Sequence, residues 1–281
     1  MRWALAALGA TLALAACGGG VSKADFVTKA DAACGPGNGT VGAVAKPTNL
    51  PELATAAGTV ATTVDGQAEA LRKVDAPGDD KAAVAGVIGA LAEVSGPARA
   101  LQDAAGKTDD AATARAANEL KAKTDAAANS AQAYGLTACG KGLQAPVTTV
   151  VEGAKTVLKA AFVAKADALC SAANRRADAL PEPTSFTSLG RYLTNYLAIE
   201  TKLFDDIKAL PVPPGDEGTV GEMLEAQNKV IALEKEAQAA AQRNNRAAFD
   251  RLDEEITVLV TQANAKFDAY ELKNCGTLSA F

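Results

Sequence analysis

Cysteine is the reactive side chain that this sequence repeats at a fixed spacing. The chain of 281 residues has five cysteines and no histidine. Four of the cysteines form two pairs whose members are 105 residues apart, Cys34 with Cys139 and Cys170 with Cys275. Thiols so distant from one another, without a Cys-x-x-Cys motif, favour structural disulfide bonds over redox chemistry.

The absence of histidine excludes many kinds of active site. It removes the commonest general base, the Ser-His and Cys-His nucleophile systems, and histidine-ligated metal centres. The acidic clusters lack the spacing of a calcium loop and are typical of helix starts and solvated helix faces. A net charge of −5 argues against nucleic-acid binding. We therefore expect no enzymatic activity, no metal, no cofactor and no nucleic-acid partner.

The N-terminus has the pattern of an export signal. Arg2 supplies a positive charge, and the apolar run that follows, up to Leu14, is too short to span a bilayer permanently. The next residues complete the sequence Leu14-Ala15-Ala16-Cys17, which resembles the lipobox of bacterial lipoproteins. This resemblance implies cleavage before Cys17, a diacylglycerol thioether on its sulfur and an acyl chain such as palmitate on its amino group. We expect residues 1–16 to be the signal peptide and residues 17–22 a lipidated tether.

The rest of the chain is written twice. The segment from Phe26 to Cys34 returns as the segment from Phe162 to Cys170, and Tyr134-Gly135-Leu136 returns as Tyr270-Glu271-Leu272, each after 136 residues. Intervening prolines and leucines pair at the same offset without a gap. We interpret the sequence as a tandem duplication.

Each copy predicts helices only. In the second copy, apolar residues recur at steps of three and four from about 150 to 180, from 186 to 210, after 219, and from 249 to 270, with proline or turn residues between these segments. Four helices with short connections predict an antiparallel up-down bundle. The fold expected is therefore all-α, with two tandem four-helix bundles at residues 23–145 and 146–281. In the first copy, Gly35-Pro36-Gly37 is expected to break or shorten the first helix.

The duplication also selects a disulfide pairing. Once Cys17 is assigned to lipid, four cysteines allow three connectivities. Each copy has one cysteine in its first helix and one just after its fourth, and these two helices are neighbours in an up-down bundle. We expect Cys34–Cys139 and Cys170–Cys275, so that one disulfide closes each bundle.

Two sets of side chains in the second copy are candidates for binding. Asn174, Arg175, Arg176, Arg243 and Arg246 could form a face for an anionic envelope protein or wall polymer, although such residues are also typical of a solvated helix face. Alternatively, aromatic residues could line an apolar cavity for a small ligand, although they are also typical of an ordinary core: Phe186, Tyr192, Tyr196, Phe204, Phe249 and Phe267.

The lipobox, the repeated Phe-Val-x-Lys-Ala-Asp-x-x-Cys helix and the closing Tyr-x-Leu-x-x-Cys-Gly together resemble uncharacterised actinobacterial envelope lipoproteins. This resemblance implies a helical, cysteine-framed fold and a position outside the cytoplasmic membrane, but no activity. The sequence therefore predicts a lipid-anchored, extracytoplasmic and non-enzymatic binding or scaffolding module, with a small-ligand carrier as the alternative.

The anchor can be tested by metabolic labelling. Cells that express the protein with a fatty-acid analogue in the medium should yield labelled protein, and the Cys17→Ala variant should not be labelled, because the thiol that accepts the lipid is gone. Labelling of the variant at the level of the unaltered protein would contradict the assignment.

Overall fold

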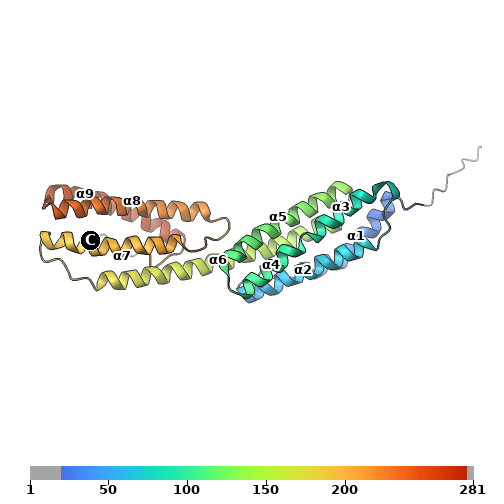
Figure 1. The fold of residues 1–281 in the computed structure, drawn as a ribbon, viewed down its shortest axis with the longest axis horizontal. Helices are drawn as coiled ribbons and strands as arrows, with labels where there is room; N and C mark the ends of the chain where they lie inside the picture. Colours follow the sequence, from blue (N-terminus) through green and yellow to red (C-terminus); the bar gives the residue numbers. More distant parts are fainter. Residues whose placement is uncertain (1–19, 277–281) are drawn as a thin grey trace, which may run out of the picture.

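The computed structural model describes residues 20–276, and these residues form helices and no strand. Figure 1 shows two helical bundles arranged end to end along the long axis of the molecule. Both predicted disulfides are formed, Cys34–Cys139 and Cys170–Cys275. The expectations of an all-α fold and of one disulfide in each bundle are thus confirmed.

The helices divide between the two bundles in chain order. The first bundle contains α1 (Lys23–Gly42), α2 (Leu50–Arg72), the short 3-10 helix η1 (Gly78–Asp80), α3 (Lys81–Ala92), α4 (Ser95–Gly106) and α5 (Asp110–Tyr134). The second contains α7 (Phe186–Lys208), α8 (Glu217–Gln242) and α9 (Arg246–Ala269). A single long helix, α6 (Ala138–Asp178), belongs to both.

Helix α6 joins the two bundles without a break. Its 41 residues begin about a dozen positions before the helix start expected near residue 150, and they run through the expected boundary between residues 145 and 146. Its first half packs on α1, α5 and α2. Two apolar sets on α6 serve the two cores: Leu143, Val147, Val150, Val151 and Ala154 in the first, and Phe162, Ala166, Cys170 and Ala173 in the second. The first bundle therefore contains a helical segment beyond the four expected.

Polar caps explain where several helices begin. The side chains of Asn49, Asp109 and Ser185 each accept a hydrogen bond from a backbone N–H in the first turn of α2, α5 and α7. Helix α7 ends just before a segment rich in proline, which cannot donate a backbone hydrogen bond. Gly135, with φ of 107°, ends α5 in the left-handed conformation that glycine adopts readily.

The expectation that Gly35-Pro36-Gly37 breaks the first helix is wrong. Helix α1 continues through this segment to Gly42. Gly37 lies where a Cβ atom would come within 2.7 Å of the Gln67 amide, so its lack of a side chain lets α2 pack closely. The Gln67 amide nitrogen donates to the Cys34 carbonyl at 3.0 Å and to the Asn38 side chain at 2.9 Å. Tertiary contacts thus offset the low helix propensity of the segment.

The third helix of the first copy is divided. A turn at Glu93 and Val94 separates α3 from α4, whereas the equivalent α8 is continuous. Within the described residues, the stretch Gly78–Gly106 is long and apolar enough to cross a membrane by length and composition, with a mean hydropathy of 1.2, and 39% of it is buried in the bundle. Because Val84, Val87 and Leu91 lie in the first core, we describe this stretch as part of that bundle.

Contacts at equivalent positions repeat between the bundles. Phe26 packs edge-on against Tyr134 with ring centroids 5.7 Å apart, and Phe162 packs in the same way against Tyr270 at 5.8 Å. The tyrosine hydroxyls donate to aspartates that are also 136 residues apart, Tyr134 to Asp80 at 2.9 Å and Tyr270 to Asp216 at 2.6 Å. These repeated contacts agree with our interpretation of the sequence as a duplication.

The close approach of α6 to the chain after α1 can be tested with one methyl group. A Cβ atom on Gly153 would clash with the Pro47 ring and lie 3.0 Å from its backbone nitrogen and oxygen. We expect Gly153→Ala to lower the free energy of unfolding by about 1–3 kcal/mol because the core must shift. The matched control is Gly66→Ala on α2, where a Cβ meets nothing within 4 Å and helix propensity should add up to about 1 kcal/mol. Urea unfolding measures both, and equal stability of the two variants would contradict this packing.

Candidate functional site

The predicted lipidation site, Cys17, lies outside the described residues. The four other cysteines are almost completely buried, and both of their disulfides join the start of a bundle to its end. Buried disulfides of this kind indicate an oxidising, extracytoplasmic environment.

The candidate binding face is only partly supported by its contacts. The Asn174 amide nitrogen donates to the Asn274 carbonyl at 3.1 Å and so holds the segment after α9 against α6. The four arginines are exposed and belong to the outer end of the second bundle, at the end of α6 and around the turn between α8 and α9. Arg246 also lies over the Phe186 ring, with its guanidinium carbon 4.9 Å from the ring centroid. Asn174 thus has a structural contact, while the arginines leave a basic end.

The repeated Phe-Val-x-Lys-Ala-Asp-x-x-Cys motif has a structural role at its aspartate. Asp31 accepts hydrogen bonds from the backbone N–H groups of Thr137 and Ala138, at the start of α6, and from the Thr137 hydroxyl. Burial raises the pKa of Asp31, but these hydrogen bonds outweigh it, so the pKa is lowered overall. The equivalent Asp167 accepts from the Asn274 N–H at 2.9 Å. The motif therefore positions the segment that carries the second cysteine of each pair.

The aromatic residues of the second bundle pack mainly against one another. Phe186 lies edge-on to Phe249 with ring centroids 5.5 Å apart, Phe204 lies 5.8 Å from Phe267, and Tyr192 stacks on Tyr196 at 6.2 Å. Five of the six belong to the hydrophobic core of this bundle or pack against it. These contacts are those of an ordinary core.

A buried polar cluster, not predicted from the sequence, lies between α7 and α8. We call it the carboxyl cluster; it consists of Glu200 of α7 with Gln227 and Glu234 of α8. The exposed fractions of these three residues are 2%, 4% and 1%. The Gln227 amide nitrogen donates to Glu200 Oε1 at 2.7 Å, and the two carboxyl groups hydrogen-bond to each other. The other oxygen of each carboxyl group, Oε2, is buried without a hydrogen-bond partner in the described structure.

The surroundings of the carboxyl cluster favour its protonated form. Burial raises the pKa of Glu200 well above its usual value, and the hydrogen bond and charge of Glu234 raise it further. Burial likewise raises the pKa of Glu234. The nearby hydroxyl of Tyr196 is affected in the same direction, because burial and then the two carboxylates raise its pKa. The two glutamates therefore share at least one proton where isolated carboxyl groups would be ionised.

The first bundle has no such cluster. At the positions equivalent to Tyr196, Glu200, Gln227 and Glu234, 136 residues earlier, the chain carries buried apolar residues: Val60, Val64, Leu91 and Ala98. A comparison of the two copies at core positions, where a charged residue replaces an aliphatic one, is the signal that could have revealed the cluster from sequence.

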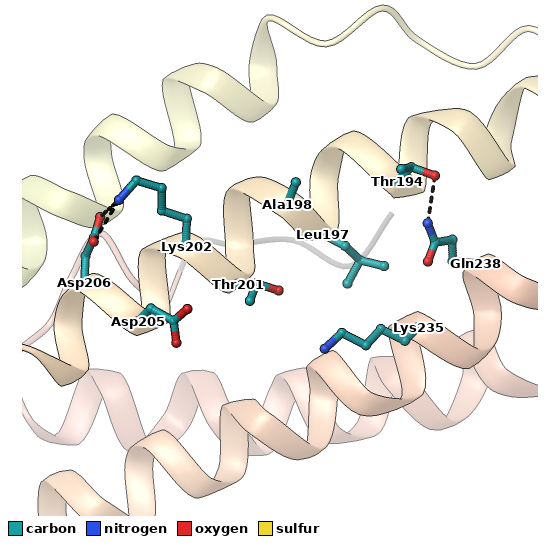
Figure 2. Close-up of a pocket in the computed structure, with 9 residues that line it drawn as sticks. All are labelled: Thr194, Leu197, Ala198, Thr201, Lys202, Asp205, Asp206, Lys235 and Gln238. Atoms are coloured by element: carbon teal, nitrogen blue, oxygen red, sulfur yellow. Dashed lines mark hydrogen bonds and ion pairs between the residues drawn. The ribbon is translucent and has the colours of Figure 1, made fainter.

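A solvent-open groove lies on the other side of the same helix pair (Figure 2). Its volume is about 610 Å³, and its lining includes residues that directly follow the two glutamates, Thr201 after Glu200 and Lys235 after Glu234. Figure 2 shows the Lys235 side chain extending between α7 and α8. At one end the Gln238 amide donates to the Thr194 hydroxyl at 2.7 Å. The groove thus brings solvent close to the α7–α8 interface that contains the carboxyl cluster.

Within residues 20–276, no group of three or more cysteine, aspartate or glutamate side chains is arranged to hold a metal ion. In comparisons with known proteins, no family model, no curated protein and no solved structure matches the chain.

Proposed function

We propose that this protein is a lipid-anchored lipoprotein of the bacterial cell envelope that acts as a non-enzymatic scaffold, with its second bundle presented to a binding partner. The anchor is supported by the sequence from Leu14 to Cys17, and the compartment by the two buried disulfides. More than one acyl chain at Cys17 would give stable membrane attachment, whereas a single chain binds only marginally.

The observation that carries the scaffold proposal is the continuity of α6. A helix of 41 residues is about 60 Å long, and its two halves are buried in two different cores. Bending between the bundles would therefore require a break in α6. In addition, Lys165 of α6 forms an ion pair with Asp110 at the start of α5, which ties the beginning of the second copy to the first bundle.

The ends of this rod differ in character. Helix α1, which follows the tether, begins at the end of the first bundle farther from the second bundle (Figure 1). The four exposed arginines of the candidate binding face belong to the opposite end, in the second bundle. An anchored rod of this form would hold a basic surface at a fixed distance from the membrane, where it could bind an acidic protein or an anionic wall polymer.

Cross-linking in intact cells tests this function. A photoreactive amino acid at Asn244, in the turn between α8 and α9, should give a defined adduct with one envelope component. The triple variant Arg175→Glu, Arg176→Glu and Arg243→Glu should lose at least about 90% of the adduct, because the basic surface becomes acidic.

The matched control replaces three exposed arginines elsewhere, Arg72→Glu, Arg115→Glu and Arg191→Glu, and should keep the adduct. Circular dichroism confirms that both triple variants are helical. No adduct from the unaltered protein, or equal loss in both triple variants, would contradict a specific role for the basic end.

A further inference from the structure

The carboxyl cluster lies where a helical bundle would ordinarily place aliphatic side chains. Glu200 and Glu234 are at least as buried as Leu203 and Phe204 beside them, and the first copy fills the same positions with valine and alanine. Burial of a carboxylate without a compensating charge is strongly unfavourable, and two carboxylates in contact also repel each other. A folded second bundle therefore requires the cluster to be neutralised.

The charged groups around the cluster are few. On α7 and α8 the groups that interact with Glu200 and Glu234 are Tyr196 and Lys235, and Lys235 is an exposed side chain on the groove side of α8. The other two helices contribute no charge, because the buried residues of α9 and of the second half of α6 are aliphatic, aromatic or cysteine. No base in the core replaces the missing positive charge.

A bound metal ion is a poorer solution than a proton. Two carboxylates and one amide oxygen could supply fewer protein ligands than the six to eight oxygens that calcium takes, and magnesium usually keeps several waters, for which a close-packed core leaves little room. A proton shared between the carboxyl groups removes one charge and makes one hydrogen bond, which is the contact that the structure contains. The amide of Gln227 then stabilises the carboxyl oxygen that it contacts.

We propose that Glu200 and Glu234 form a proton-controlled latch, which holds α7 against α8 while the pair keeps its shared proton and loosens this half of the second bundle when the proton is lost. The groove on the opposite side of α7 and α8 gives water a short route to the pair once the helices separate (Figure 2). The latch rests on contacts within the second bundle alone, so its failure would leave the proposed anchor and scaffold untouched.

The direction of the pH dependence follows from linkage. The folded-state pKa of both glutamates is raised above the usual value of 4.5. Between pH 4.5 and the raised value, the folded pair therefore holds protons that the unfolded chain has released. Stability is fully present below about pH 4.5 and is lost as the pH rises through the folded-state pKa, at about a tenfold change in the unfolding constant per pH unit for each retained proton.

Hydrogen exchange followed by mass spectrometry on the purified full-length protein tests the latch from pH 5 to pH 9. Protection factors, which are corrected for the intrinsic pH dependence of exchange, should fall at least about tenfold in α7 and α8 and stay constant in α2 and α4, the internal reference. The double variant Glu200→Gln, Glu234→Gln should keep its α7 and α8 protection constant within about threefold.

Two further variants keep the test decisive. If the glutamine pair does not fold, Glu200→Val with Glu234→Ala copies the first bundle and should also be independent of pH. The surface control Glu236→Gln with Glu254→Gln should retain the full pH dependence. Equal pH dependence in α2, α4, α7 and α8, or a dependence that persists in both core variants, would overturn the latch. Restoration of protection at pH 8 by millimolar magnesium, calcium or manganese, in the unaltered protein only, would overturn it in favour of a cation site.

Discussion

The structure depends on one constraint, which is that α6 is packed in two cores at once. Its N-terminal half completes the first bundle and its C-terminal half begins the second, so neither bundle can be separated at the repeat boundary without exposing apolar side chains such as Val150 or Phe162. Asp31 fixes the start of α6, and the Cys34–Cys139 disulfide ties the same region to α1. A tandem repeat has in this way become a single rod.

The two bundles use the same frame for different interiors. The disulfide, the phenylalanine–tyrosine contact and the tyrosine–aspartate hydrogen bond are repeated in both. In the loop-entropy model, a disulfide between residues 105 apart destabilises the unfolded chain by about 4–5 kcal/mol. Such a frame can tolerate a small-residue core in the first bundle and, in the second, two buried carboxyl groups.

The sequence predicted the helical class and both disulfides because these follow from local periodicity and from the repeat spacing. It did not predict that α6 runs through Pro146, or α1 through Pro36, because local propensity favours breaks there, whereas tertiary contacts stabilise the helix in the folded chain. It also missed the carboxyl cluster. Glu200 occupies a gap in the apolar stripe of α7, between Tyr196 and Leu203, and a single glutamate on a helix resembles a surface residue until its burial is known.

The continuity of α6 is the central claim, and the distance between its ends tests it most directly. Spin labels attached through non-canonical amino acids at Lys141 and Arg175, both exposed on α6, leave the native cysteines unaltered. These positions are 34 residues apart, so an unbroken helix separates their backbones by about 50 Å. Double electron–electron resonance should give one narrow distribution near that distance. A broad or shorter distribution would show that α6 bends between the bundles and would contradict the single rod.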